Sequence, residues 1–424
     1  MTVALFVLLF VFLFTGAPVY IAMSLASVLA LSFFTPIPME VVAQRMFSGI
    51  DKFSLMAVPF FILAANVMKG GGISKRILNL ASKLVGHLTG GLAIAVVISC
   101  MFFGAVSGSS PATVVAIGGL MLPELLKGGY GEKFSLGLIT SSPAVAVIIP
   151  PSIGMIVYGT VTGVSVGDLF IGGIGPGIVW GLVVIVYCYF IAKKDKVPVQ
   201  EKASLKEILI AFKEAAWALG VPFIIIGGIY GGIFTPTESA VVASVYAIFV
   251  AIFIYKQLDF KGLLDESIDA AVGTAQVMIL LAAASIFSWI LTRQQIPQAL
   301  AEGLIAITNS KVTILLMMNI ILLVAGMFID PASSTTILAP LFLPLAINYG
   351  IDPIHLGIIM VVNGAIGMFT PPFGLNLFVA TGVSKEPVSK IISGIVPFVI
   401  LSLITMAIVT YVPQVTMFFV NTMK

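Results

Sequence analysis

Long apolar runs, interrupted by short polar or proline-containing breaks, constrain this chain more than any other feature. Apolar residues make up 59% of the sequence and charged residues 9%, whereas soluble domains carry about 25% charged residues. A transmembrane barrel would show alternating segments of about 10 residues instead of continuous apolar runs. The sequence therefore predicts an all-α polytopic membrane protein.

The stretch Phe102–Leu126 contains a break that differs from an ordinary loop. The apolar runs on its two sides, Gly91–Val106 and Ala112–Leu126, hold 16 and 15 residues, and a spanning helix needs about 20. Two short apolar helices around a Ser-Gly-Ser-Ser-Pro tip predict a re-entrant hairpin over residues 91–126. Non-helical backbone at membrane depth is tolerated only inside protein or beside water, so this tip is a candidate site.

The second half of the chain repeats the first at an offset of about 221 residues. Pro371-Pro372 follows Pro150-Pro151 at this spacing, and a second tip begins at Asp330. We therefore predict two inverted repeats, each with about five transmembrane segments and one re-entrant hairpin. The expected parts are the first repeat (1–200, hairpin 91–126, broken span 134–163), an amphipathic cytoplasmic connector (201–216) and the second repeat (217–424, hairpin 311–346, broken span 354–383).

The distribution of basic residues supports the inversion. With five crossings in each repeat, the outer side receives five of the 21 Lys and Arg, and the other 16 fall on the inner side. Cytoplasmic loops carry such an excess, so we expect a multi-pass membrane protein with its basic loops on the cytoplasmic side. Hairpin one then opens from the cytoplasm and hairpin two from outside, as in secondary transporters with inverted repeats. The outer basic residues are Arg45, Lys52, Arg293, Lys311 and Lys424.

Four regions outside the hairpins and breaks carry their own expectations. Val3–Phe33 crosses either twice or once as a tilted span. Lys69–His87 is interpreted as a basic loop, because it holds Lys75, Arg76 and Lys83. In Lys193–Lys213 the apolar spacing of Leu205, Ile208, Leu209 and Phe212 predicts a helix on the membrane surface, and Gln257–Asp269 is a second such candidate.

Both tips offer the start of a helix. Ser110 before Pro111, and Asp330 before Pro331, match an N-cap followed by proline at the first helical position. The free backbone N–H groups of a helix start favour an anion such as a substrate carboxylate. An alternative is that the hydroxyls only cap helices, and that Arg293 is an interfacial arginine. The expected substrate-binding residues are Ser109, Ser110, Ser152, Arg293, Asp330 and Asn376.

The same tips supply hard oxygen ligands. Hydroxyl, amide and backbone carbonyl oxygens suit Na⁺ or a similar cation, and a carboxylate at membrane depth indicates function by default. The expected Na⁺ set comprises Ser107, Gly108, Ser109, Ser141, Pro150, Asp330, Ser333, Ser334, Asn363, Gly364 and Thr370.

Several function classes are disfavoured by what the sequence lacks. It contains no Gly-Lys dipeptide, hence no Walker A loop, so we expect no use of ATP. Its two histidines are far apart and no His-Glu-x-x-His occurs. A membrane-embedded enzyme would need clustered carboxylates or a metal set, whereas the tips are rich in hydroxyls. We expect no enzyme activity and no nucleic-acid partner, and we expect membrane lipid around the chain.

Three segments resemble the large membrane subunit of TRAP transporters: Gly104–Ser109, Ile148–Ile153 and Thr370–Phe378. The resemblance implies a Na⁺-driven importer of small organic acids, with C4-dicarboxylates and sialic acid as known substrates and sialic acid favoured on general likeness. It also implies a location in the bacterial inner membrane, an elevator mechanism and two partners, a small four-helix membrane subunit and a periplasmic binding protein. A stand-alone carrier or exchanger of the same architecture is the alternative.

The resemblance carries roles onto both tips and both breaks. One departure concerns the first tip, which reads Ser-Ser-Pro where many relatives have small residues such as alanine, so substrate contacts there are expected to differ. The carried-over residues are Ser107, Gly108 and Ser109, then Pro150, Pro151 and Ser152, then Asp330, Ser333 and Ser334, and finally Asn363, Thr370 and Pro371.

Overall fold

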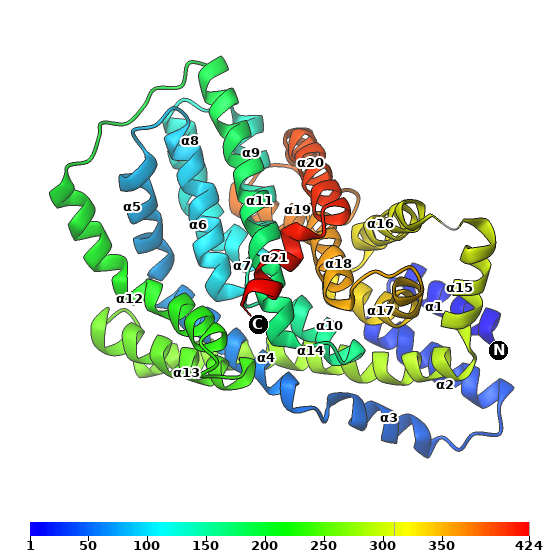
Figure 1. Cartoon of the computed structure of the whole chain (residues 1–424). Helices are drawn as coiled ribbons and strands as arrows, with labels where there is room; N and C mark the ends of the chain where they lie inside the picture. Colours follow the sequence, from blue (N-terminus) through cyan, green and yellow to red (C-terminus); the bar gives the residue numbers. More distant parts are fainter. Residues whose placement is uncertain (309, 424) are drawn as a thin grey trace.

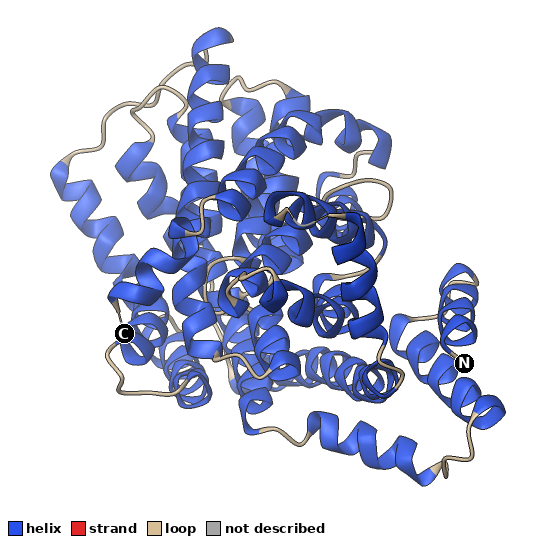
Figure 2. Ribbon diagram, turned by 45° about the vertical axis from the view of Figure 1, so that its right-hand side comes forward, coloured by secondary structure: helices blue, strands red, loops and turns tan. Residues whose placement is uncertain are grey.

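The structure, a computed structural model, describes residues 1–308 and 310–423, and these residues form helices and loops without a strand (Figure 2). Seven of the described helices are long and apolar enough to cross a membrane. This confirms the predicted polytopic helical class. The seven are η1–α4 (Phe53–Gly70), α11 (Val166–Lys194), α12 (Leu205–Tyr230), α13–η4 (Pro236–Ile254), α14 (Phe260–Arg293), α16 (Lys311–Phe328) and α20 (Val388–Tyr411).

The N-terminal apolar stretch forms two helices, α1 (Thr2–Phe14) and α2 (Val19–Phe34), which pack against each other. Gly16 lies between them with a φ of 82°, a left-handed conformation that glycine adopts without steric cost. Of the two possibilities for this region, the structure therefore has two helices and not one tilted span.

The helices fall into two packed groups (Figure 1). In the first, called the α14 group, α2, α3 (Glu40–Ile50) and α4 (Ala57–Gly70) pack on α14, while α13 packs on α4 and α12. Figure 1 shows α14 running beneath α10 and α17. The α14 group comprises α1–α4 with η1 and α12–α14 with η4.

The second group, called the hairpin group, comprises α6–α11 and α16–α21. Short helices α5 (Ile73–Val85) and α15 (Ile296–Ile307) link the two groups. The remaining members are α6 (Gly91–Ser107), α7 (Ser110–Thr113), η2 (Val114–Gly118), α8 (Gly119–Lys127), α9 (Glu132–Ser141), η3 (Ser142–Val147), α10 (Ile153–Thr162), α17 (Pro331–Asn348), α18 (Pro353–Gly367), α19 (Leu375–Ser384) and α21 (Gln414–Thr422).

Helix ends lie at both polar tips and at both Pro-Pro pairs. The first hairpin is α6 followed by α7–η2–α8, and the second is α16 followed by α17. Each broken span has a Pro-Pro pair between its two helical parts, and both pairs, Pro150-Pro151 and Pro371-Pro372, contain a cis peptide bond. The arm after each break packs on the opposite hairpin: α10 contacts α17, and α19 contacts α7 and η2.

The first arm of each hairpin crosses the neighbouring broken span at very short range. A Cβ added to Gly104 would lie 2.6 Å from the Cα of Ala146, and one added to Gly367 would lie 2.5 Å from the carbonyl oxygen of Gly326. Small residues at such crossings allow backbones to approach closely inside a membrane. These glycines therefore fix how each hairpin sits on its broken span.

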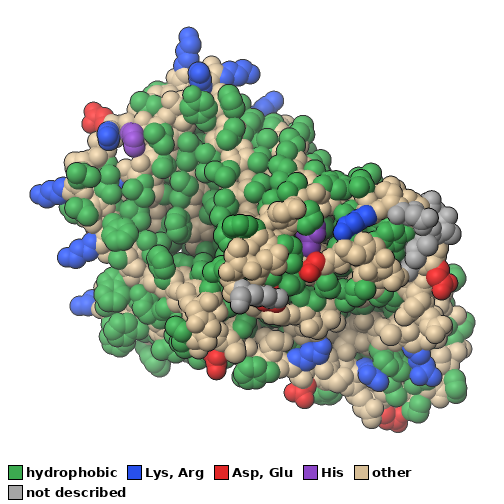
Figure 3. Space-filling view, viewed as in Figure 1, with side chains coloured by type: hydrophobic (Ala, Val, Ile, Leu, Met, Phe, Trp, Pro, Cys, Tyr) green, Lys and Arg blue, Asp and Glu red, His purple; other side chains and the backbone are tan. Residues whose placement is uncertain are grey.

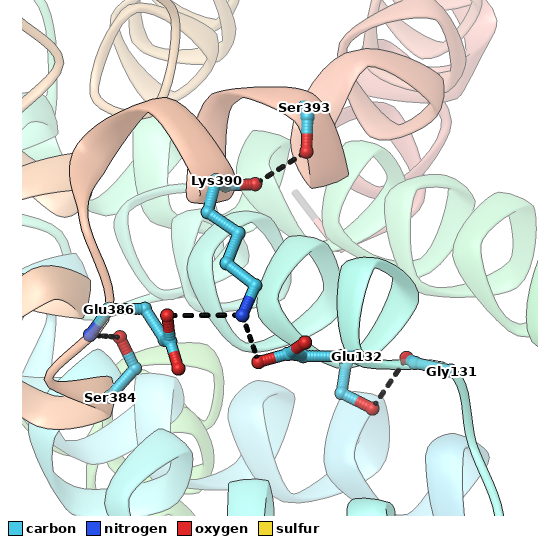
Figure 4. Close-up of polar contacts among 7 residues, drawn as sticks. Gly131, Glu132, Ser384, Glu386, Lys390 and Ser393 are labelled. Carbon is cyan, nitrogen blue, oxygen red and sulfur yellow. Dashed lines mark hydrogen bonds and ion pairs between the residues drawn. The ribbon is translucent and has the colours of Figure 1, made fainter.

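Lys390 connects the two halves of the chain at one end of the hairpin group (Figure 4). Its ammonium in α20 lies 2.5 Å from a Glu132 carboxylate oxygen at the start of α9 and 3.1 Å from Glu386. The three side chains are a third or more exposed, so solvent screening limits the contribution of these pairs to stability. Packing of α9 on α20 holds this contact more than the charges do.

The predicted basic loop at Lys69–His87 is wrong, because most of it is helix α5. Ile73, Ile77, Leu80 and Ala81 are buried on one face of this helix, and Lys83 on the other face pairs with Glu207 of α12 at 2.9 Å. The apolar residues of this segment follow the spacing of an amphipathic helix, and the basic residues lie between them.

The amphipathic segments are not separate surface helices either. The connector predicted over 201–216 continues as α12 from Leu205 to Tyr230, and the stretch 257–269 leads into α14. Between Phe212 and Trp217 stand Lys, Glu, Ala and Ala, which are good helix formers, so nothing ends the helix there. In Figure 3, Lys and Arg side chains gather along the upper left edge, where α5, α11 and α12 end or begin.

Candidate functional site

The first tip is a cluster of hydroxyl groups that contact one another and the backbone. Helix α6 ends at Ser107, and Gly108 turns the chain with a φ of 55°. The Ser107 and Thr113 hydroxyl oxygens are 3.2 Å apart, and Thr113 donates to the carbonyl of Ser109 at 2.8 Å. The N-cap of the returning arm is Ser109, whose Oγ accepts from the N–H of Ala112. The predicted N-cap, Ser110, is wrong by one residue, since proline fits the second helical position as well as the first.

The first tip lies directly against the first break. A Cβ on Gly108 would sit 2.5 Å from the Pro151 carbonyl oxygen, so only glycine fits between them. Ser152 caps α10, accepting from Met155 N–H and donating to the Val147 carbonyl at 2.6 Å. Its hydroxyl proton is therefore committed, and only oxygen lone pairs remain for a ligand.

Asn376, at the start of α19, connects the second break to the first tip. This buried side chain donates from Nδ2 to Ser110 Oγ at 2.7 Å and to the Thr140 carbonyl at 3.0 Å. Its Oδ1 has no hydrogen-bond partner in the described chain. The nearby Ser141 hydroxyl donates to the Gly137 carbonyl of its own helix.

Two residues of this cluster, Thr113 and Thr140, were not singled out from the sequence. Each lies inside an apolar run with no proline or glycine next to it. Thr113 could have been found as a hydroxyl two residues after Pro111, whereas Thr140 lies ten residues before Pro150 and carries no such signal.

Replacing Asn376 with Leu should weaken the whole site. Ser110 Oγ and the Thr140 carbonyl would lose their shared donor while staying buried, and an unsatisfied buried polar group costs roughly 1–3 kcal/mol. We expect a lower thermal midpoint in detergent and slower substrate uptake for Asn376→Leu. Asn79→Leu, at an exposed position of α5, is the matched control. Equal thermal midpoints and uptake rates for the two variants would contradict this role of Asn376.

The second tip is built around Asp330, the N-cap of α17. Its Oδ1 accepts from the N–H groups of Ala332 and Ser333, both at 3.0 Å, and its Oδ2 accepts from the Ser333 hydroxyl. Three of roughly four lone-pair sites of the carboxylate are thus used. Asp330 is exposed, and it borders a cavity of about 180 Å³ together with Phe328, Met368 and Phe373.

Helix α18, which leads into the second break, packs against this tip. A Cβ on Gly364 would lie 2.8 Å from Pro331. Asn363 donates to Asn319 Oδ1 at 2.7 Å and to the Ile359 carbonyl at 2.8 Å, while its own Oδ1 is buried without a partner in the described chain. Thr370 donates to the Ile366 carbonyl at 2.6 Å.

The predicted Na⁺ residues therefore fall into two sets. Ser107, Gly108 and Ser109 lie with the first break, and the second tip lies with the second break. Unpartnered buried oxygens occur at both, namely Ser142 Oγ and Asn376 Oδ1 at the first and Asn363 Oδ1 at the second. Hard oxygen donors of this kind fit an alkali cation. Within the described chain, no three His, Cys, Asp or Glu side chains gather as a transition-metal site would need.

Comparison with known protein families decides the identity of the chain. The family described as "Tripartite ATP-independent periplasmic transporter, DctM component" matches residues 6–415. The chain belongs to this DctM family. Its relatives are transporter permease subunits and not enzymes, as the sequence predicted.

Curated relatives of this DctM-family chain match it over nearly its whole length. It is 43% identical to the C4-dicarboxylate TRAP transporter large permease DctM of Vibrio cholerae, covering 97% of this chain and 96% of that one. It is 40% identical to the ectoine TRAP large permease TeaC of Halomonas elongata, covering 96% of each. It is also 43% identical to the isethionate TRAP permease DctMQ of Oleidesulfovibrio alaskensis, but spans only 64% of that longer protein.

Two solved transporter structures share the fold of the DctM-family chain. The YdaH transporter of Alcanivorax borkumensis superimposes with a TM-score of 0.67 at 15% identity, over 93% of this chain and 97% of that one. MtrF of Neisseria gonorrhoeae gives 0.62 at 13% identity, over 92% and 93%. At these identities the likeness concerns the fold alone.

Arg293 is the predicted substrate residue that the described contacts do not bring to a tip. It is exposed at the end of α14, and its guanidinium lies 5.5 Å from the ring centroid of Trp289. Arg45 of α3 lies 5.1 Å from the same ring. In the DctM-family chain this arrangement fits the interfacial alternative, in which two arginines and a tryptophan mark a membrane surface.

Proposed function

We propose that this chain is the transport subunit of a Na⁺-coupled importer of small organic acids in the bacterial inner membrane. The observation that carries the proposal is that each tip packs closely on a broken span, with buried oxygens nearby that have no hydrogen-bond partner in the described chain. Broken helices with sites between them are the architecture of secondary transporters. Family membership implies a small membrane subunit and a periplasmic binding protein as partners.

The two tips differ in charge, which supports different ligands for them. A helix start attracts anions, and at the first tip the cap is the neutral Ser109. At the second tip the Asp330 carboxylate already occupies the helix start and repels a further anion. We therefore place the organic acid at Ser109 and Ser110 with Asn376, and a Na⁺ beside Asp330, Ser333 and Asn363.

Inverted repeats are supported by equivalent details 221 or 222 residues apart. The N-caps Ser109 and Asp330 are such a pair, and the crossing of Gly104 over Ala146 corresponds to that of Gly326 over Gly367. An inverted pair of hairpins gives one tip access from each side of the membrane. The division at about 200–217 remains our prediction for the boundary between the repeats.

An elevator mechanism is supported by the separation into two helix groups. The hairpin group holds both tips and both breaks, so it is the part that would carry substrate. The α14 group contains neither, and it packs largely on itself. We propose that the hairpin group moves against the α14 group during transport.

The substrate is proposed as a small organic acid of C4-dicarboxylate size ahead of sialic acid. The relatives quoted above are named for C4-dicarboxylates, isethionate and ectoine, and sialic acid has only the general likeness in its favour. The neutral hydroxyl and amide groups of the first tip suit a carboxylate or sulfonate.

Uptake by reconstituted protein tests this function against the stand-alone alternative. Proteoliposomes with the chain and its small subunit would be given a C4-dicarboxylate, isethionate, ectoine or sialic acid, with and without the binding protein. We expect uptake of one class only when the cognate binding protein is present. Transport by this chain alone would favour the stand-alone carrier.

A further inference from the structure

Three hydrogen bonds are described between the α14 group and the hairpin group. Lys52 donates from Nζ to the Thr160 carbonyl at 2.6 Å, and the Ser54 hydroxyl lies 3.3 Å from the Thr160 hydroxyl. Tyr230 donates to the Phe170 carbonyl at 3.2 Å. Thr160 lies in the last turn of α10, Phe170 near the start of α11, and Tyr230 at the end of α12. In the topology proposed above, all three places face the outer side.

Lys52 lies three residues after a tightly packed contact within its own group. It follows α3, which touches α14 so closely that a Cβ on Gly49 would lie 2.3 Å from the Cβ of Ser285. Its ammonium reaches a carbonyl in the last turn of α10, where helix carbonyls are unsatisfied and favour a cation. Lys52 also lines a cavity of about 100 Å³ between the groups. Other residues that line it include Ser285 and Ser288 of α14 and Thr336 of α17.

We infer that Lys52, Ser54 and Tyr230 form an outer clasp, which holds the two groups together in this conformation and must open in each transport cycle. The inference rests on the proposed function, because it takes the hairpin group to move. Among the hydrogen bonds of the described chain, none joins the two groups at their inner ends. Bonds confined to one side favour the state that is closed on that side.

The labelling rate of a cysteine introduced at position 336 tests the clasp. With Cys100 and Cys188 replaced by Ala, Thr336→Cys reports on the cavity that Lys52 lines. Adding Lys52→Met should speed its labelling by a membrane-impermeant thiol reagent from outside about tenfold, equivalent to about 1.4 kcal/mol. The control is Lys311→Met, because Lys311 donates to the Gly350 carbonyl at 2.8 Å within the hairpin group. Equal labelling rates in the two variants would overturn the clasp.

A crosslink tests whether the clasp opens during transport. A variant with both Ser54→Cys and Thr160→Cys, in the same cysteine-free background, should form a disulfide on oxidation and so lose both free thiols. We expect uptake by the complete transporter to stop on oxidation and to return on reduction. A crosslinked protein that still transports, or a pair that never crosslinks, would refute the clasp. Failure of the proposed function appears separately, as absence of uptake in the reduced protein.

Discussion

Asp330→Asn is expected to abolish most Na⁺-driven uptake while leaving the protein folded. Asparagine keeps an oxygen that can accept from the Ala332 and Ser333 N–H groups, so the cap of α17 survives. It removes the negative charge that the proposed Na⁺ needs. A hydrogen bond to a charged group is worth roughly 1.5–3 kcal/mol, and a loss on this scale lowers the initial uptake rate about 10- to 100-fold. Asp330→Ala should lose the cap as well, at about 1 kcal/mol.

Asp352→Asn is the matched control for this prediction. Asp352 also caps a helix just before a proline, accepting from the Ile354 N–H at 2.8 Å, and it is exposed like Asp330. It belongs to neither tip. Its substitution should leave both uptake and the thermal midpoint unchanged. An Asp330→Asn protein that transports as fast as Asp352→Asn would show that the carboxylate only caps.

The second large effect concerns the crossing of α16 and α18. Gly367→Ala places a methyl group 2.5 Å from the Gly326 carbonyl oxygen, and that neighbour is backbone, which cannot rotate away. Overpacking of this kind typically costs about 1–3 kcal/mol. We expect a clear drop in the thermal midpoint in detergent, and loss of uptake because the second tip is displaced.

The control for this variant is Gly227→Ala in α12, where a Cβ would meet nothing within 4 Å. Alanine exceeds glycine in helix stability by about 1 kcal/mol, so this change should be neutral or stabilising. The two alanine substitutions should therefore move the thermal midpoint in opposite directions. A shift of the same sign and size would contradict the close crossing.

The hairpins and breaks could be predicted because their signals are local. Short apolar arms, polar tips and Pro-Pro pairs recur at one spacing, and the structure has a helix end at each tip and at each Pro-Pro pair. The N-cap at Ser110 was wrong by one residue because proline fits either of two early helical positions. Helix α5 was missed because three basic residues concealed its buried face.

Contacts between distant segments could not be predicted in the same way. Asn376 and Ser110 are 266 residues apart, and no local pattern links an amide after one break to a serine in the opposite hairpin. The length of α12 was missed for a different reason: a surface segment and a span can share one helix when no glycine or proline separates them. The position of Arg293 just after a span fits an interfacial arginine as well as a substrate-binding one.

The direct test of the central claim is uptake driven by a Na⁺ gradient. Proteoliposomes containing both membrane subunits would receive the binding protein and its organic acid under an inward Na⁺ gradient, or with Na⁺ replaced by K⁺. We predict accumulation above the external concentration with the Na⁺ gradient, and none with K⁺. Equal accumulation under both conditions would contradict Na⁺ coupling at the paired tips.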